Sequence, residues 1–359
     1  MIAPERCPDV YFTAGYGHAA ATLGGGRWEC AGEDERALLP YVLTGADGGV
    51  DAASPYGYSG VHVSASCPAG HLRRFWAAAT DRLRDAGAST LFLRFSPLDD
   101  ASRRAAAELP GLTVTRRGDT ITVPTGGGAD AVWAGLAGRA RTAVRKAEQA
   151  GHRCRLRRAE AADLGADAPF RTLYERTMLR VGAAAGYHFP DGYYPALLAG
   201  LGGGLLLAEV SRPAEPPVAA ALLMLHGDRV HYHLAGSAPA AGAGGAGNLL
   251  LWTVLRWAAD TGRAVVHLGG GVSGEDGLFR FKRSFGGERT AFWTGAVVLD
   301  EAAYRRRLHE HAARLGVPPH QIERSGYFPG YRYVEPAGPA PSVPSAHRIS
   351  VSPAQMRSG

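Results

Sequence analysis

Apolar residues recur with a helical period at several places along the chain and alternate with short apolar runs that predict strands. Between residues 70 and 86, one face carries Leu72, Phe75, Trp76, Ala79 and Leu83, which is typical of an amphipathic helix. The same criteria predict helices at 16–23 and 99–109 and strands at 27–30, 38–43 and 90–95. Two more short strands, 112–115 and 120–123, are expected to pair as a hairpin over the turn 117–119.

Three consecutive glycines at 126–128 predict a linker, and a second series of elements follows them. We expect a helix (129–150), a strand (152–156), two helices (170–181, 191–201), three strands (205–210, 218–226, 229–235), a helix (248–260), a strand (264–268), a short helix (277–285) and a strand (290–299). This order is that of an N-acetyltransferase (GNAT) unit, and the first series follows it more loosely.

The element order predicts an α/β (α+β) fold with two tandem GNAT-like domains, each a mixed, largely antiparallel sheet flanked by helices. We expect an N-terminal domain over 1–128 and a C-terminal domain over 129–300. Residues 301–335 should form a helix and an extension that pack back on the domains. Residues 336–359 are rich in Pro, Ser, Ala and Gly and should form a flexible tail.

Composition narrows the class of protein without naming a function. A length of 359 residues favours two domains, and 46% hydrophobic with 20% charged residues excludes a wholly disordered, fibrous or coiled-coil protein. The net charge of +6 allows a polyanionic partner, although a GC-rich coding sequence is the plainer source of so much arginine. No signal peptide and no apolar run of about 20 residues is visible. We therefore expect a soluble, cytoplasmic monomer without stable membrane insertion.

Metal sites and nucleotide-binding loops find little support. The four cysteines stand apart, so neither a zinc ribbon nor a dithiol site is indicated. His231 and His233 share a strand face without a third ligand, which favours histidines of a core or cleft over a metal site. The loop 242–247 matches G-x-G-x-x-G before a helix but lacks the acidic residue of a dinucleotide fold. It remains either a flexible loop or an anion-binding helix start.

The helix 277–285 is the most informative segment. Leu278, Phe281, Lys282 and Phe285 follow the helical period, so a lysine lies on the stripe that otherwise faces the core. Its head either reaches water along an apolar surface or stays partly desolvated in a cleft. A fixed, desolvated ammonium can stabilise the oxyanion that forms during acyl transfer.

Residues 139–158 carry eight basic residues and one acidic residue, Glu148. The helical part of this stretch has an inward face of Leu136, Ala140, Val144 and Ala147, so its arginines should form an exposed ridge. A ridge of this kind is either a solvated helix face or a contact for phosphates such as those of RNA.

Several segments resemble the Fem-like aminoacyltransferases, the peptidoglycan-bridge and antibiotic branch of the GNAT superfamily. The resemblance covers roughly 54–298, and its most specific part is Gly-Leu-Phe-Arg-Phe-Lys-Arg-Ser-Phe-Gly at 277–286, similar to that family's G-[LI]-x-x-F-K-x-x-F-G signature. Supporting segments are Ser-Pro-Tyr-Gly-Tyr-Ser-Gly at 54–60, Arg-Thr-Ala-Val-Arg-Lys-Ala at 141–147 and the acceptor-type region from Arg176 to Tyr194. Departures are Val-His-Leu-Gly at 266–269, where the family often shows aromatic-Asp-aromatic-Gly, and a missing helical-arm insertion.

The resemblance implies a transferase that moves an aminoacyl group from a charged tRNA to an amine, with no cofactor besides this co-substrate. Lys282 would stabilise the oxyanion, and Phe281 would position the aminoacyl-adenosine end. The residues implied in substrate binding are Arg180, Tyr187, Tyr194, Tyr232, Tyr56 and Tyr58. The residues implied in tRNA binding are Arg141, Arg145, Lys146, Arg280 and Arg283.

The expected reaction is therefore amide-bond formation on a small-molecule, antibiotic-type acceptor or on a cell-wall precursor. One alternative is a GNAT enzyme that uses acyl-CoA at the loop 242–247, although no Gln or Arg precedes the glycines as in ordinary members. The other alternative is a non-catalytic RNA-binding protein of GNAT ancestry, in which Lys282 only packs.

Overall fold

The computed structural model describes residues 3–334, apart from 33, 47, 242–243 and 272–273. The tail expected at 336–359 and the first two residues of the loop 242–247 therefore lie outside the described residues.

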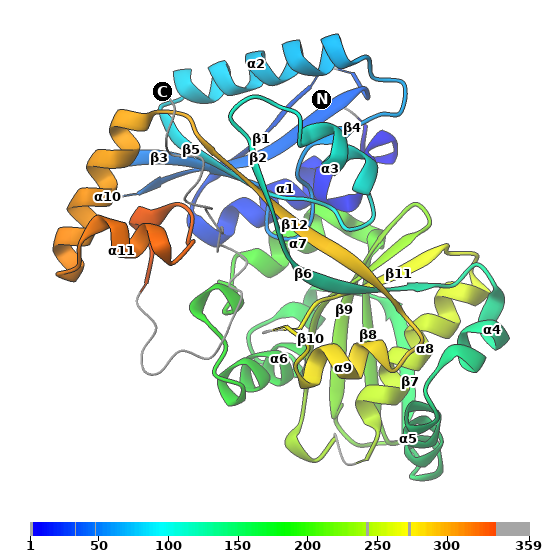
Figure 1. The fold of residues 1–359 in the computed structure, drawn as a ribbon. Coiled ribbons are helices and arrows are strands. Elements are labelled where there is room, and N and C mark those ends of the chain that lie inside the picture. Colours follow the sequence, from blue (N-terminus) through cyan, green and yellow to red (C-terminus); the bar gives the residue numbers. More distant parts are fainter. Residues whose placement is uncertain (1–2, 33, 47, 242–243, 272–273, 335–359) are drawn as a thin grey trace.

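Strands from both halves of the chain form one continuous mixed sheet (Figure 1). Its strand order is β1 (Arg27–Ala31), β2 (Ala37–Ala46), β3 (Gly49–Ala53), β5 (Ala88–Arg94), β12 (Glu288–Val298), β6 (Thr113–Pro124), β11 (Val265–Gly269), β10 (Arg229–Ser237), β9 (Ala219–His226), β8 (Leu205–Ser211) and β7 (Arg153–Arg158). The pairs β3–β5 and β10–β11 are parallel, whereas the other neighbours along this path are antiparallel. A short strand, β4 (His62–Val63), pairs with β2 beside this path. The predicted mixed α/β class is confirmed.

Helices cover both faces of the second half of the sheet, which explains why its strands are almost continuously apolar. Leu223 of β9 packs in the core on one face, and its neighbour Leu222 packs in the core on the other. The first face is covered by α4 (Gly128–Gly135), α5 (Gly138–Gln149), α8 (Ala246–Asp260) and the short helix α9 (Gly277–Arg283). The opposite face is covered by α1 (Ala14–Ala21), α6 (Pro169–Arg180) and α7 (Tyr193–Leu201).

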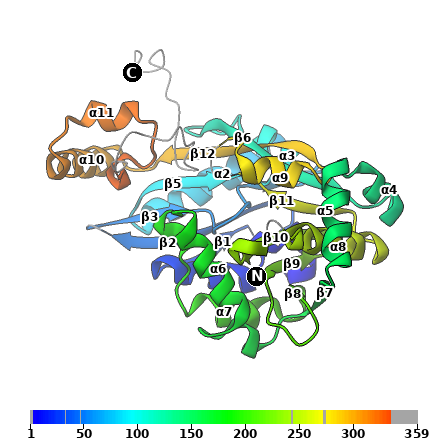
Figure 2. The same cartoon turned by 90° about the horizontal axis from the view of Figure 1, so that it is seen from below.

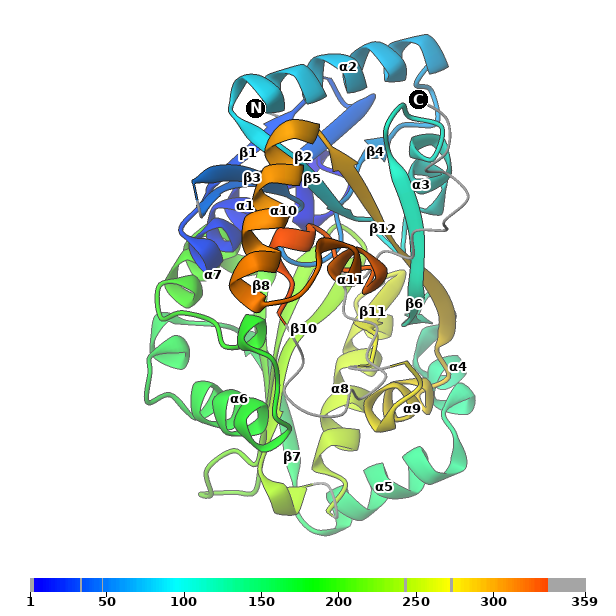
Figure 3. The same ribbon diagram turned by 60° about the vertical axis from the view of Figure 1, so that its left-hand side comes forward.

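The first half of the sheet carries α2 (Ala69–Asp85) on one face, where the predicted stripe packs against β2, β3 and β5 and all of it except the half-buried Phe75 is buried. The helix α3 (Asp100–Ala106) precedes β6, and the helices α10 (Glu301–Leu315) and α11 (Pro319–Arg324) follow β12. Phe328, after α11, packs on Phe92 and Ala296, on alternate positions to those that contact α2. Figure 3 shows α10 and α11 packed against this end of the molecule. None of the helices within the described ranges combines the length and apolar character needed to cross a bilayer.

The expected hairpin at 112–123 is wrong, because this segment is the single strand β6. It pairs with β12 from Thr113 to Thr122 and with β11 from Ile121 to Pro124, so its backbone groups find partners without a turn. The residues Arg-Gly-Asp at 117–119 lie instead where the register with β12 shifts by one residue.

The expected helix over 129–150 is interrupted, because Leu136 adopts an extended conformation between α4 and α5. The guanidinium of Arg141 donates to the carbonyls of Leu136 and, at 3.1 Å, of Ala134. These carbonyls at the end of α4 lack helical partners, so Arg141 caps the first helix from the second.

Strand β12 belongs to the second predicted domain but lies between β5 and β6 of the first. The two predicted domains therefore share one sheet, and the division near residue 128 stays a prediction.

A buried ion pair holds α10 against the sheet. Arg307 is 4% exposed and donates to Asp51 of β3 at 2.8 Å, and Arg332 contacts the other oxygen of Asp51 at 2.6 Å. The ring of Tyr331 stacks 3.8 Å from the Arg307 guanidinium, and its hydroxyl donates to Asp51. Two arginines thus share one buried carboxylate.

We expect Asp51→Ala to lower the free energy of unfolding by about 3–5 kcal/mol, because two cations lose their buried partner. Urea denaturation followed by circular dichroism measures this loss. Arg305→Ala is the control: it breaks the exposed Arg305–Glu301 pair of the same helix and should cost less than about 1 kcal/mol. Equal losses in the two variants would contradict the structural role given to Asp51.

Candidate functional site

Lys282 of α9 is buried beside the end of β11. Asp276 caps α9 by accepting from the Phe279 amide at 2.8 Å, which fixes the helix start after β11. Phe279 and Phe285 anchor α9 in the core. Lys282 is 8% exposed, and its Nζ donates to the Gly270 carbonyl at 2.7 Å. The structure thus places the lysine in the desolvated position rather than in the snorkelling one.

Burial lowers the pKa of Lys282 to about 8, and nearby Asp276 opposes this shift. Withdrawal from water disfavours the charged form of an amine, which explains the direction. At neutral pH the group is still mainly an ammonium, although a poorly hydrated one. Such a cation interacts more strongly with a developing negative charge than a cation in water does.

Tyr58 from the first half of the chain meets Lys282 at Gly269. This glycine has a φ of +69°, and a Cβ there would lie 3.5 Å from the Tyr58 hydroxyl and 3.6 Å from Nζ of Lys282. The hydroxyl and the ammonium therefore face the same point at the carboxyl end of β11. The half-buried ring of Tyr58 packs edge-on against His267 (4.8 Å) and Phe292 (5.3 Å).

Arg94, which the sequence did not single out, holds the turn that carries Tyr56 and Tyr58. Its Nε donates to the Gly57 carbonyl at 2.7 Å. Its guanidinium lies over the Tyr58 ring at 5.6 Å and over the Tyr56 ring at 5.9 Å. This cation fixes both tyrosines, and it is positioned by its own strand, β5.

Two buried histidines, His231 and His267, and the half-buried His233 lie beneath the tyrosines. His231 and His267 are register partners on β10 and β11, and their rings are 5.6 Å apart. Burial and His231 keep the pKa of His267 well below its usual value, so this imidazole is neutral. Burial together with His231 likewise lowers the pKa of His233 to about 3, and its Nε2 lies 2.6 Å from the Tyr193 hydroxyl.

Asp9 supplies the counter-charge of this layer. Its carboxylate lies 2.8 Å from Nε2 of His231 and 3.1 Å from Arg229. Burial alone would raise the pKa of Asp9, but His231 and Arg229 lower it to about 2. The carboxylate is therefore ionised and ties the amino-terminal segment to β10. His231 thus has Asp9 as its partner, and His233 has Tyr193. Within the described ranges, no group of three or more His, Cys, Asp or Glu side chains could hold a metal ion.

The other residues expected in substrate binding lie in different places. Tyr56 borders the same layer, with its ring 5.3 Å from Phe189. Arg180 and Tyr187 are exposed near the end of α6, where Arg180 donates to the Ser237 carbonyl at the end of β10 at 3.0 Å. Tyr187 is 38% exposed.

Two expected substrate-binding tyrosines lie in apolar cores instead. Tyr194 is fully buried with Arg171 4.0 Å above its ring, and its neighbour Tyr193 is the residue that faces the histidines. Tyr232 packs in the α8 core on the opposite side of the sheet from His231. The sequence alone does not indicate which of the adjacent residues Tyr193 and Tyr194 faces the histidines. For His267 there was a signal, because Val-His-Leu-Gly at 266–269 departs from the pattern of the Fem-like family.

A basic ridge crosses α5 and α9, which lie side by side (Figures 2 and 3). We define it as Arg139, Arg145, Lys146, Arg280 and Arg283, all exposed. The two helices touch where the Ala137 amide donates to the Ser284 carbonyl at 2.8 Å and Arg139 donates to the Arg280 carbonyl at 3.4 Å. Arg141 is half-buried at the end of α4, and Arg157 of β7 is paired with Asp163 and Glu209.

The glycine loop leads into α8 beside this ridge. Gly245 has a φ of +75°, and a Cβ there would lie 2.2 Å from the Ala143 carbonyl, so only glycine allows this contact with α5. A Cβ on Gly247 would lie 3.9 Å from the ring of Phe281. The start of α8 therefore lies next to the half-buried Phe281, between α5 and α9.

Comparison with known proteins identifies the kind of fold. The model of the acetyltransferase (GNAT) domain matches residues 136–283. The crystal structure of FemX superposes with a TM-score of 0.65 at 14% identity, over 83% of this chain and 94% of that chain. The structure of L-PGS from Bacillus licheniformis superposes with a TM-score of 0.52 at 13% identity, over 82% of this chain and 93% of that chain. The C-terminal domain of a putative lysylphosphatidylglycerol synthetase from Agrobacterium fabrum superposes with a TM-score of 0.51 at 14% identity, over 81% of this chain and 90% of that chain. No curated protein matches the sequence.

The sequence contains only two lysines, Lys146 and Lys282, which makes the buried ammonium directly measurable. With lysine labelled by ¹³C at Cε, the Lys282 resonance is the one that Lys282→Met removes. We expect it to titrate with a midpoint near pH 8, because burial disfavours the ammonium. A midpoint at the usual lysine pKa of about 10.4 would show that the amine is hydrated.

Proposed function

Because the chain has a Fem-like GNAT fold, we propose that it is an aminoacyl-tRNA-dependent transferase. It would form an amide bond between the aminoacyl group of a charged tRNA and an amine of a small-molecule, antibiotic-type or cell-wall-precursor acceptor. The observation that carries the proposal is the desolvated ammonium of Lys282, held on the Gly270 carbonyl beside Tyr58. The GNAT match and the Fem neighbour support an acyltransferase, and the aminoacyl donor is the finer part of the proposal.

The chemistry needs no metal and no strong base. The acceptor amine, in its neutral form, attacks the ester carbonyl and forms a carbon–nitrogen bond and a tetrahedral oxyanion. The oxyanion collapses, the ester bond breaks, and the proton lost by the amine ends on the terminal ribose hydroxyl of the tRNA. An aminoacyl ester is already activated, so alignment and charge stabilisation carry the rate.

In this proposal Lys282 provides the charge stabilisation, worth about 3 kcal/mol for one well-placed donor. The Tyr58 hydroxyl, which shares the Gly269 corner, would align the reacting groups, with Arg94 holding its ring. Phe281 would contact the aminoacyl-adenosine end, since it lies beside the start of α8.

For the acceptor, Tyr56, Tyr187 and the exposed Arg180 remain the proposed contacts. Arg180 is anchored at the end of β10 and suits an anionic group. Tyr194 and Tyr232 would act only by shaping the cores on either side of β10.

For the donor, the basic ridge would contact the tRNA backbone, with the half-buried Arg141 shaping its base. A charged tRNA is found in the cytoplasm, so the proposal also places the enzyme there. The second candidate, an acyl-CoA-dependent GNAT enzyme, is favoured by one observation: the backbone amides at the start of α8 lie next to Phe281, and a helix start can hold a phosphate.

The deciding experiment offers candidate amines together with either charged tRNA or acyl-CoA, with and without RNase. We expect product from charged tRNA only, and RNase should abolish it. Lys282→Met should lower the rate about 10²–10³-fold, as for loss of one oxyanion donor. The ratio of wild-type to Lys282→Met rates should fall as pH rises through about 8, because the wild type loses its ammonium there.

Taking this ratio cancels the titration of the acceptor amine, which is common to both proteins. RNase-insensitive product from acyl-CoA would replace the first candidate by the second. Full activity of Lys282→Met would contradict the role given to the ammonium in either case.

The ridge has its own test. Arg145→Glu and Arg283→Glu should each weaken tRNA binding and reduce the salt dependence of the binding constant by about one unit of slope per lost phosphate contact. The matched control is Arg306→Glu on α10, at the opposite end of the molecule from α5 (Figures 1 and 2). Binding titrations at several salt concentrations measure both effects. Equal affinity for all three variants would remove the ridge from the tRNA path.

A further inference from the structure

The end of α6 and the turn after it expose a cluster of apolar side chains. Five large hydrophobic residues in the described part of the chain are exposed, and three of them lie within nine residues: Leu179 (71%), Val181 (57%) and Tyr187 (38%). Single exposed apolar residues are common on protein surfaces, whereas a cluster of them marks a surface that contacts another body. We call residues 176–188 the α6 tip.

Ordered backbone presents this cluster. Gly182 has a φ of +60° and ends α6, and its amide donates to the carbonyl of Leu179 at 3.2 Å. The hydroxyl of Thr177 donates to the Ser237 carbonyl at 3.1 Å and accepts from the Ser237 amide at 2.9 Å, which ties the end of α6 to the end of β10. The backbone therefore holds Leu179 and Val181 at the surface.

Two arginines flank Leu179 on the outer face of α6. Arg176, Leu179 and Arg180 are spaced at i, i+3 and i+4, which places them on one side of the helix, and all three are exposed. Arg180 donates to the Ser237 carbonyl, which leaves most of its five N–H groups free. Neither arginine forms an ion pair with any carboxylate that the structure describes.

The acidic residues nearest along the chain are paired with another cation. Residues 176–190 contain no Asp or Glu. Glu175 and Asp191, on either side of this stretch, both contact the guanidinium of the buried Arg171, at 2.7 Å and 2.6 Å. The α6 tip is therefore a surface that is both apolar and positively charged.

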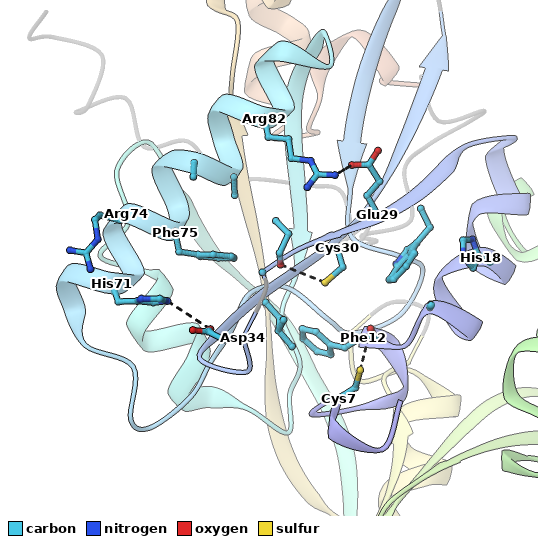
Figure 4. A pocket seen from close by; sticks show the side chains of 17 residues that line it. Cys7, Phe12, His18, Glu29, Cys30, Asp34, His71, Arg74, Phe75 and Arg82 are labelled. Carbon is cyan, nitrogen blue, oxygen red and sulfur yellow. Dashed lines mark hydrogen bonds and ion pairs between the residues drawn. The ribbon is translucent and has the colours of Figure 1, made fainter. Parts of the chain in front are cut away.

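A cavity of about 750 Å³ beside β1 shows the opposite arrangement (Figure 4). Among its lining residues, Arg82 contacts Glu29 at 3.0 Å, and His71 lies 3.9 Å from Asp34. These charges are matched within the protein, so they do not call for an external anion. The arginines of the α6 tip have no such carboxylate.

We propose that the α6 tip contacts an anionic lipid bilayer as a peripheral anchor that does not span it. Leu179 and Val181 enter the boundary between headgroups and acyl chains, and the Tyr187 hydroxyl stays at the level of the headgroups. Arg176 and Arg180 contact the lipid phosphates. A protein partner suits this surface less well, because a stable protein interface takes about 20–30 residues from each side, more than the tip supplies.

The α6 tip borders the candidate site. Phe189, directly after the tip, packs against the ring of Tyr56 at 5.3 Å, and the Tyr174 hydroxyl donates to the Tyr187 carbonyl at 2.7 Å. A molecule bound through the tip turns the proposed acceptor contacts Arg180 and Tyr187 toward the bilayer. This consequence rests on the proposed function, whereas the binding itself does not.

The test measures sedimentation of the full chain with vesicles, without donor or acceptor, so its outcome is independent of transferase activity. We expect the wild type to bind vesicles of phosphatidylcholine and phosphatidylglycerol in about a 2:1 ratio, and to bind pure phosphatidylcholine about tenfold less tightly. Leu179→Ser/Val181→Ser should weaken binding about tenfold, because two side chains that the bilayer buries are lost. Arg176→Gln should weaken binding and reduce its salt dependence.

Two matched controls keep the result specific. Leu278→Ser/Val334→Ser removes the other exposed leucine and valine and should bind like the wild type. Arg145→Glu/Arg283→Glu should also bind like the wild type, because α5 and α9 of the basic ridge cover the opposite face of the sheet from α6. The melting temperature of Leu179→Ser/Val181→Ser should be unchanged, since both side chains are exposed in the folded protein.

Equal vesicle binding by the wild type and Leu179→Ser/Val181→Ser would overturn the proposal. Absence of wild-type binding at low salt would do the same, as would loss of binding in the ridge variant alone. Sedimentation velocity without vesicles supplies the remaining outcome: self-association of the wild type that Leu179→Ser/Val181→Ser abolishes would show that a second copy, and not a bilayer, covers the α6 tip.

Discussion

Strand β12 pairs with β5 along one edge and with β6 along the other, and this double pairing brings the site together. The strand comes from the end of the second half of the chain, yet it is inserted among the strands of the first. Phe292 on β12 contacts the ring of Tyr58 and lies 5.1 Å below the guanidinium of Arg94. The pairing thus fixes, relative to α9 and Lys282, the turn that carries Tyr56 and Tyr58. Together with the pairing of β6 and β11, it holds in one sheet the elements that carry the Tyr58 hydroxyl and the Lys282 ammonium.

The sequence predicted most elements because their signals are local. Apolar stripes gave the helices, and the order of elements together with the F-K-x-x-F-G segment indicated a Fem-like GNAT fold, which the structure and its neighbours confirm. The hairpin expected at 112–123 failed for a non-local reason. Arg-Gly-Asp resembles a turn, but the partner of this segment is β12, about 170 residues further along the chain. The hydrogen bonds between β6 and β12 stabilise an extended strand here, and no local sequence pattern predicts a partner so far along the chain.

The site was predictable in part. Lys282 stood out because a cation interrupts an apolar stripe, and Tyr58 stood out in a turn-rich segment. Arg94 and Asp9 gave no signal, since an arginine after a buried strand and an aspartate before a short helix are ordinary in sequence. Their roles arise from contacts across the sheet, such as Asp9 with His231, which are 222 residues apart. The choice between Tyr193 and Tyr194 depends on how α7 rotates against the sheet, which adjacent identical residues cannot reveal.

The composition has a chemical consequence at Lys282. Of the 39 lysines and arginines, only two are lysines, so arginine occupies nearly every position that a cation fills. The buried corner at Gly269 is an exception, and among the described residues the acceptor for its cation is the Gly270 carbonyl, which suits the three donors of an ammonium better than the five of a guanidinium. Because the chain has so few primary amines, an amine-selective electrophile small enough to reach Lys282 meets only one other lysine, the exposed Lys146. The protein therefore lends itself to covalent labelling at Lys282 by an amine-selective electrophile.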